Sequence, residues 1–140
     1  MIGAILAKRA AAGAYDSMNR HHLPAVMVGL RDDAVSTYPG NTPASGTFEG
    51  KSAIEAWFRR WFELFPEVRF EVQDICVGNI FDVVGNNVVA AHWNIQITNR
   101  EGYTGKNSGV SLITTERGKV TALKEFMFDA EEHRRGWGLA

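Results

Sequence analysis

Three polar residues alternate with large apolar ones inside a run of β-branched and aromatic residues: His92, Asn94 and Gln96. Alternate side chains of a strand point to opposite faces of a sheet, so this side is the wetter or the functional one. Imidazole has an ordinary pKa near 6.5, which would let His92 orient a carbonyl group or relay a proton. A polar row on a solvent face or at a subunit interface would give the same pattern without any chemistry.

A carboxylate on the last apolar run is the second candidate. Glu125 shares one side of an expected strand with Leu123 and Met127. It therefore either points inward, toward His92 or an arginine, or stands as an exposed strand charge. In an apolar pocket, loss of hydration raises the pKa of a carboxylic acid and lets it exchange protons near neutral pH. One well-placed acid in such a pocket is enough for general acid–base chemistry.

Other polar clusters favour structural roles. Asp32 and Asp33 lie where a helix gives way to a strand, and Asp at such turns bonds local backbone N–H groups. His21 and His22 end an expected helix, where a positive imidazole suits the helix dipole. Adjacent histidines do not share a helix face, and no Cys partner or His–Glu spacing accompanies them. The sequence predicts no metal and no cofactor.

An aromatic helix is the clearest element that could position these groups. Over residues 52–65 the hydrophobic positions step by three and four, Ser52 and Glu55 are spaced as a capping box, and Pro66 ends the helix. The aromatic positions on this face are Trp57, Phe58, Trp61, Phe62 and Phe65. Facing strands that carry Trp93, Phe126 and Phe128, these rings would line a small-molecule site or simply fill a core, since large apolar residues do both.

The remaining elements follow from periodicity and turn residues. Residues 1–22 form an Ala-rich helix, Pro24 opens a short helix over 25–30, residues 34–38 form a short strand, and 39–46 form a loop. After Pro66 the period changes to two, and strands are expected at 68–77, 80–84, 88–98, 109–115 and 120–128. Short turns between consecutive strands force antiparallel pairing. Residues 1–140 are thus expected to form one α+β domain with helices on one face of a curved antiparallel sheet.

Charge and cysteine content exclude several partners. The 15 Lys and Arg residues against 16 Asp and Glu residues give a net charge of −1, with no broad positive field for nucleic acid and no polybasic segment for anionic lipid. The single Cys76 cannot form an internal disulfide, and the apolar run 2–6 is too short for a secretory signal. We therefore expect a cytoplasmic protein with neither a nucleic-acid nor a membrane partner.

Three segments together carry a family resemblance: Asp32-Asp33-Ala34-Val35 with Pro39, Gly50-Lys51 opening the aromatic helix, and the closing run 118–129. In this order they resemble the nuclear transport factor 2-like cone fold and, within it, the SnoaL-like and ketosteroid isomerase-like proteins. The resemblance implies a cone-shaped, cystatin-like curved sheet, an apolar pocket and a homodimer. It fixes no reaction, because this fold hosts isomerases, cyclases, dehydratases, hydrolases and binding modules.

The resemblance also implies site residues. The ketosteroid isomerase pattern would place its base near Tyr38, its donor tyrosine near Ala14 and its protonated acid near Asn107. None of these residue types is retained, although Tyr15 is one step away and Asn107 can donate a hydrogen bond. The SnoaL-like pattern fits better, because Asp129 stands where that family has an acid/base at the end of the last strand. A solvated acid that ends the strand explains Asp129 equally well.

Two functions are compatible with these observations. The first is a cofactor-independent enzyme using acid–base chemistry on an apolar cyclic substrate, of isomerase, cyclase, dehydratase or epoxide hydrolase type. Its catalytic residues would be Asp129 and His92. The substrate-binding residues would be Tyr15, Tyr38, Trp57, Phe58, Trp61, Asn107, Glu125 and Met127. The alternative is a non-catalytic ligand-binding or dimerisation module of the same fold, with tryptophan rings filling its interior.

Overall fold

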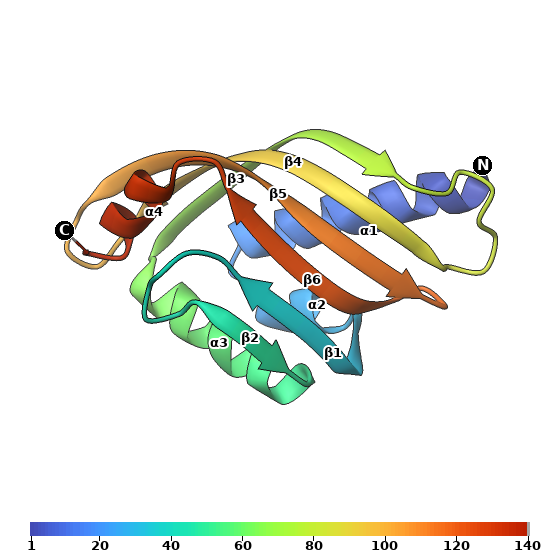
Figure 1. Cartoon of the computed structure of the whole chain (residues 1–140), viewed down its shortest axis with the longest axis horizontal. Coiled ribbons are helices and arrows are strands. Elements are labelled where there is room, and N and C mark those ends of the chain that lie inside the picture. The colour runs from blue at the N-terminus through green and yellow to red at the C-terminus, as the bar shows by residue number, and fades with distance from the viewer. Residues whose placement is uncertain (140) are drawn as a thin grey trace.

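The computed structural model describes residues 1–139 and shows a curved sheet partly wrapped around helices (Figure 1). The helices are α1 (Ile2–Asn19), α2 (Leu23–Met27), α3 (Lys51–Leu64) and α4 (Ala130–Gly136). The strands are β1 (Leu30–Tyr38), β2 (Gly46–Glu49), β3 (Glu67–Val77), β4 (Asn87–Thr98), β5 (Thr104–Glu116) and β6 (Lys119–Met127). The predicted α+β class is confirmed. No helix among residues 1–139 is long and apolar enough to cross a membrane.

The sheet has the order β2-β1-β6-β5-β4-β3. Strands β3 to β6 form the expected antiparallel meander, whereas β1 pairs in parallel with β6. This crossover pairing sets the first strand beside the last, and Thr37 lies opposite Lys124 in register. On the other side of β6, Glu125 lies opposite Ser111 of β5. The pairing therefore brings residues from both halves of the chain to one face of the sheet.

Helix α3 packs on that face through its predicted aromatic stripe, with Ile54, Phe58 and Trp61 buried. The predicted capping box is wrong, because the helix begins at Lys51 and no side chain caps it. Gly50 is the N-cap residue instead, with a φ of 91° that favours glycine. The N–H group of Gly50 donates to the carbonyl oxygen of Ala34, which fixes the start of the helix against β1.

The strand predicted at residues 80–84 is wrong, and the segment is an ordered loop between β3 and β4. The Asp82 carboxylate accepts hydrogen bonds from the backbone N–H groups of Val84 and Gly85. The side chain of Asn79 accepts from the N–H group of Phe81. These turn bonds replace the strand partners that the apolar residues alone would suggest.

Element boundaries differ from the sequence-based ones in three further places. The short helix ends at Met27, so that Leu30 already belongs to β1. Strand β5 begins at Thr104 rather than at Gly109, because pairing with β4 runs through to Thr98. Strand β2 and helix α4 have no counterpart among the predicted elements.

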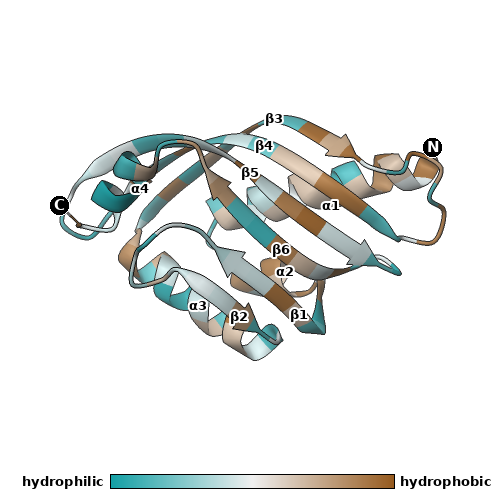
Figure 2. Cartoon of the chain, viewed as in Figure 1, coloured by the Kyte–Doolittle hydropathy of each residue, from teal (hydrophilic) through white to brown (hydrophobic). Residues whose placement is uncertain are grey.

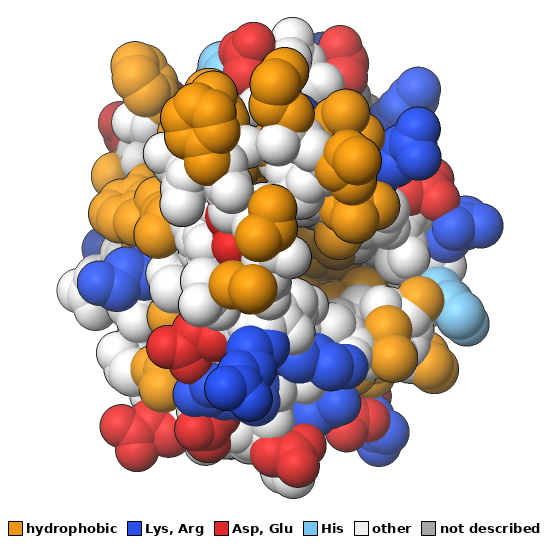
Figure 3. Space-filling model, turned by 90° about the vertical axis from the view of Figure 1, so that its right-hand side faces the viewer, with side chains coloured by type: hydrophobic (Ala, Val, Ile, Leu, Met, Phe, Trp, Pro, Cys, Tyr) orange, Lys and Arg blue, Asp and Glu red, His pale blue; other side chains and the backbone are white. Residues whose placement is uncertain are grey.

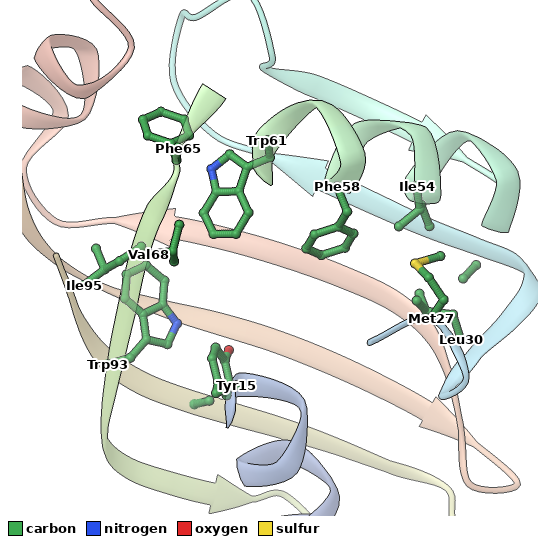
Figure 4. Packing of buried hydrophobic residues seen from close by; sticks show 12 residues of the cluster. Tyr15, Met27, Leu30, Ile54, Phe58, Trp61, Phe65, Val68, Trp93 and Ile95 are labelled. Atoms are coloured by element: carbon green, nitrogen blue, oxygen red, sulfur yellow. The ribbon is translucent and has the colours of Figure 1, made fainter. Parts of the chain in front are cut away.

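A continuous apolar core lies between the helices and the sheet (Figure 4). Trp93 is fully buried, and its indole lies over Gly109, where an added Cβ would come within 2.5 Å of the ring. Figure 2 shows hydrophobic residues along the strands, and also at the N-terminal end of α1 and in the loop between β3 and β4. Most of the first group forms the core, whereas the second is exposed. Phe126 and Phe128 are also exposed, so the expectation that they face the aromatic helix is wrong.

Candidate functional site

The core does not close completely, and a cavity of ≈ 100 Å³ remains between the sheet and helices α1, α2 and α3. Its walls are mainly aromatic and aliphatic, with Trp57, Phe58 and Trp61 on the α3 side. The rings of Trp57 and Trp61 are stacked with their centroids 5.7 Å apart. A cavity of about 150 Å³ in a protein core can hold a benzene ring, so a one-ring molecule would also use part of the open side of this space.

One carboxyl group lies in this apolar cavity, that of Glu125 on β6. The hydroxyl of Ser111 donates to Glu125 Oε2 at 2.6 Å, and the indole N–H of Trp93 donates to Ser111 Oγ at 2.9 Å. Because the Ser111 oxygen already accepts a hydrogen bond from Trp93, the Ser111 hydroxyl proton is directed at the Glu125 carboxylate. Glu125 Oε1 has no hydrogen-bond partner among residues 1–139, so this oxygen is left for a ligand.

Burial changes the chemistry of this carboxyl group. Loss of hydration raises the pKa of Glu125 from 4.5 to about 7, and the hydrogen bond from Ser111 offsets only part of the rise. No ion pair with Glu125 is formed anywhere in the described residues, so no cation holds the group ionised. Near neutral pH, Glu125 therefore exists in both protonation states, as a general acid or base requires.

Tyr15 of α1 lies beside this group and is buried. Figure 4 shows its hydroxyl pointing toward the Trp93 indole nitrogen. Burial, and secondly the charge of Glu125, raise the pKa of the Tyr15 phenol above its ordinary value, while contacts with Ser111 and Trp93 lower it in part. Tyr15 thus stays protonated at neutral pH and can donate a hydrogen bond inside the cavity.

A second polar cluster joins β1 to the C-terminal helix. The Tyr38 hydroxyl lies 3.0 Å from His133 Nε2, and Trp137 Nε1 donates to Tyr38 at 3.3 Å and to His133 Nε2 at 3.2 Å. Because the indole N–H can only donate, His133 Nε2 is the acceptor and the imidazole proton resides on Nδ1. Burial lowers the pKa of His133, which keeps the ring neutral.

A smaller cavity of ≈ 40 Å³ lies beside this second cluster, lined by Tyr38, His133 and Trp137. Tyr38, Trp61, Ile95 and Met127 line both cavities, so the two spaces adjoin. Burial raises the pKa of the Tyr38 phenol, and the charge of the Glu125 carboxylate adds to the rise. The two polar clusters therefore interact electrostatically.

Asp129 lies outside the cavity, contrary to the expectation of an acid that projects into it. Its side chain is exposed and is the N-cap of α4, where Oδ1 accepts from the N–H group of Glu132 at 2.9 Å. A helix that begins directly after the last strand needs such an acceptor, which explains the position of the acid. Asn107 supports the same turn, because its side-chain amide donates to the Asp129 carbonyl oxygen and accepts from the Asp129 N–H group.

His92 also lies away from the cavity. It is exposed on the opposite face of the sheet, where its Nδ1 atom is 3.3 Å from a carboxylate oxygen of Asp74. The polar row of His92, Asn94 and Gln96 is thus an outer surface, one of the two alternatives that the sequence left open.

Seven of the predicted site residues do line the main cavity: Tyr15, Tyr38, Trp57, Phe58, Trp61, Glu125 and Met127. Asn107 lines only the smaller cavity. Sequence reasoning missed Ser111 and His133. The alternation of Gly109, Ser111 and Ile113 was the available signal for Ser111, whereas nothing local indicates that His133 reaches Tyr38. No three His, Cys, Asp or Glu side chains gather as a metal site within residues 1–139.

The fold is shared with many solved structures. One, from Bacillus subtilis and described as a candidate isomerase, has a TM-score of 0.81 at 18% identity and covers 100% of this chain and 98% of its own. A candidate polyketide cyclase from Xanthomonas campestris pv. campestris has a TM-score of 0.72 at 16% identity, covering 94% and 96%. TerC, co-crystallised with polyporic acid, has a TM-score of 0.77 at 16% identity, covering 93% and 96%.

Curated protein sequences give no significant match. The family model of the SnoaL-like domain, by contrast, matches residues 11–123, which include the second half of α1, all of α3 and most of the sheet. The matched region supplies Tyr15, Tyr38, Trp93 and Ser111, whereas Glu125 and the C-terminal helix lie just beyond it. The chain therefore belongs to the SnoaL-like domain family.

Proposed function

We propose that this protein is a small-molecule enzyme of isomerase or cyclase type, with Glu125 as its acid/base. The observation that carries the proposal is a carboxyl group without a cation partner, placed in an apolar cavity that raises its pKa to about 7. A carboxyl group tuned to neutral pH in an apolar cavity is typical of proton-transfer sites. This assignment puts Glu125 in the role that the resemblance gave to Asp129.

The proposed reaction begins with proton abstraction from a carbon atom next to a carbonyl group. Glu125 takes the proton at Oε1 while Ser111 continues to donate to Oε2. The carbonyl oxygen gains negative charge, which the protonated phenol of Tyr15 stabilises by donating a hydrogen bond. Glu125 then returns the proton at a different atom of the substrate. Glu125, Ser111 and Tyr15 all belong to the protein, so these reaction steps need no cofactor.

The substrate that fits this site is compact and mostly apolar. The cavity volume of ≈ 100 Å³ is of the order required for one ring, and the adjoining space of ≈ 40 Å³ allows a short extension toward Tyr38. We therefore propose a cyclic ketone of one or two rings. The isomerase and polyketide cyclase descriptions of structures with the same fold favour this reaction class.

Proton abstraction can be tested without knowledge of the natural substrate. Cyclohexanone and tetralone are incubated with the protein in heavy water, and proton NMR follows the loss of their α-proton signals. We expect exchange above the buffer rate, a rise in rate with pH that levels off near neutrality, and a loss of about a hundredfold or more in Glu125→Gln. Asp129→Asn is the matched control, because Asn is also a good N-cap residue, and it should keep the wild-type rate.

The alternative function is a binding module without turnover. It is favoured by the loss of all three ketosteroid isomerase residue types at the corresponding positions. A binding module would give tight, saturable binding of the same ketones in a thermal-shift assay but no exchange above the buffer rate. Equal exchange rates for wild type and Glu125→Gln would also contradict the enzymatic proposal.

A further inference from the structure

Exposed apolar residues are concentrated at one end of the molecule. Of the 13 large hydrophobic side chains that are exposed in the described chain, eight belong to two segments. These are the start of α1, with Met1, Ile2, Ile5 and Leu6, and the loop between β3 and β4, with Ile80, Phe81, Val83 and Val84. We call these eight residues the apolar end; Figure 3 shows hydrophobic side chains gathered over the upper part of this face.

The loop presents these side chains outward in an ordered conformation. Phe81 is 76% exposed and Val83 is 83% exposed, whereas Asp82 between them is buried. The Asp82 carboxylate accepts hydrogen bonds from two backbone N–H groups of its own loop, and the Asn87 side chain donates to the carbonyl oxygen of Asn79. Asp82 and Asn87 thus face inward while the apolar residues face solvent, the reverse of an ordinary surface loop.

The two segments form one surface because α1 packs directly against the loop. At Gly3, an added Cβ would lie 2.1 Å from the carbonyl oxygen of Asp82, so only glycine allows this approach. The turn between β5 and β6 adjoins the same loop, since the N–H group of Gly118 donates to the Gly85 carbonyl oxygen at 3.1 Å. The apolar end is therefore formed by two distant parts of the sequence, and a third part, the turn between β5 and β6, lies beside it.

Cations without acidic partners flank the apolar end. Lys8 and Arg9 lie on α1 after its first turn, Arg117 lies on the adjoining turn, and Lys119 begins β6. All four are exposed, and no ion pair to any of them forms within residues 1–139. Figure 3 shows basic side chains beside and below the hydrophobic group. No run of the sequence is polybasic, which is why the sequence alone predicts no membrane partner.

From this arrangement we infer that the apolar end docks on the surface of an anionic lipid bilayer. Exposed aromatic and aliphatic side chains enter the interface between headgroups and acyl chains, and flanking Lys and Arg residues pair with anionic headgroups. A second copy of the chain is the alternative occupant, which the experiment below distinguishes from lipid. A lipid surface can cover the apolar area and pair with the cations that have no acidic partner.

The mouth of the cavity lies at the same end. Val26, Leu30 and Val120 line the cavity where α2 ends and where β1 and β6 begin, and Lys119 Nζ donates to the carbonyl oxygen of Val28 on this rim. Figure 3 shows a hollow lined by hydrophobic side chains beside the patch. If the proposed function holds, a docked molecule takes its apolar substrate directly from the bilayer. The docking itself does not depend on that function.

Sedimentation with vesicles tests the docking. Phosphatidylcholine vesicles with and without phosphatidylglycerol are mixed with the full chain and pelleted over a series of salt concentrations. We expect binding to the anionic vesicles that weakens with salt. A Phe81→Ser, Val83→Ser double variant should lose about tenfold in affinity, and a Lys8→Gln, Arg9→Gln double variant should lose a similar factor on anionic vesicles only.

Two matched controls carry the same chemical changes elsewhere. Phe128→Ser removes an aromatic ring that is 91% exposed at the end of β6, and Arg60→Gln with Arg100→Gln removes two exposed positive charges from other surfaces. Both should bind as wild type. Absence of vesicle binding, equal losses in variants and controls, or a dimer that Phe81→Ser, Val83→Ser dissociates in sedimentation equilibrium would overturn the inference. The last outcome would identify a second copy as the occupant. Because no substrate enters this assay, its failure leaves the test of Glu125 intact.

Discussion

Glu125 makes the protein less stable as the pH rises. Its pKa is raised from 4.5 to about 7, so the folded state binds the proton more tightly than the unfolded state. The resulting stability is fully present below the ordinary pKa and is lost as the pH rises through about 7. A shift of this size corresponds to a loss of about 3 kcal/mol.

The Glu125→Gln variant should lack this loss and exceed wild type in unfolding free energy above neutral pH. Urea unfolding followed over a pH series measures the effect. Glu49→Gln, an exposed glutamate on β2, is the control and should keep the wild-type slope. A decline with pH that persists in Glu125→Gln would show that another group is responsible.

Ser111 influences the pKa of Glu125. Its hydrogen bond lowers the Glu125 pKa, so Ser111→Ala should raise that pKa further and move the midpoint of the ketone exchange rate to higher pH. The indole N–H of Trp93 also loses its acceptor, which should cost about 1–3 kcal/mol of unfolding free energy. The pH profile of exchange measures the first effect. A midpoint that moves to lower pH would contradict the assigned role.

The residue scale is also where sequence reasoning is least complete. Alternation predicts correctly that Glu125 and Met127 share one side of a strand, but it leaves open which side is buried. Asp129 has the better family match and yet lies in solvent, because α4, which the sequence analysis does not anticipate, needs an N-cap residue. The partners of Glu125 come from β4 and β5, and only the pairing register places them.

Helix α4 depends on the hydroxyl of Tyr38. Tyr38→Phe removes the group that contacts both His133 and Trp137. We expect a loss of about 1–2 kcal/mol of stability and faster hydrogen exchange at the amides of α4 than elsewhere. The pKa of His133 is lowered by burial, so the unfolded state binds its proton first and the docked helix should loosen further as the pH falls below 6.5. Unchanged protection of α4 would contradict this assignment.

The contact between β4 and β5 requires glycine at position 109. A Cβ there would lie 2.2 Å from the carbonyl oxygen of Phe126 and 2.5 Å from the Trp93 ring. Gly109→Ala should therefore destabilise the fold by about 1–3 kcal/mol in urea unfolding. Gly13→Ala on α1 meets nothing within 4 Å and should stabilise the protein by about 0.5–1 kcal/mol. Equal effects of both substitutions would contradict the packing described.

Local sequence patterns predict which helices and strands are present better than they predict where each one begins and ends. The aromatic helix and the long strands follow from periodicity, whereas residues 80–84 read as a strand and form a loop. Their apolar residues are those of a strand, but Asp82 and the flanking asparagines bind the backbone locally. Composition cannot show whether strand pairing or these local turn hydrogen bonds are the more stable.

At the scale of the molecule, the α+β class and the antiparallel meander follow from the sequence. The parallel pairing of β1 with β6 does not, since nothing in either segment specifies a partner about 90 residues away. That pairing joins Tyr38 to the sheet beside Glu125 and so completes the cavity. The homodimer implied by the resemblance stays a prediction, for which sedimentation equilibrium is the direct test.

Ligand binding in the cavity should be separable from the stability of the fold. Ala14 lines it from α1, so Ala14→Leu should fill part of the space and lower ketone affinity at least about tenfold with little change in stability. Ala12→Leu, on an exposed position of the same helix, should bind as wild type. Thermal shifts with and without tetralone measure both variants. Equal shifts for the two would indicate that the ligand binds elsewhere.

The most direct test of the central claim is a pH titration of the Glu125 carboxyl carbon by NMR, with the resonance assigned by its absence in Glu125→Gln. A carboxyl group buried in an apolar cavity without a cation partner predicts a midpoint near 7. A midpoint near the ordinary value of 4.5 would mean that water reaches the group freely, and would contradict its role as the acid/base of this site.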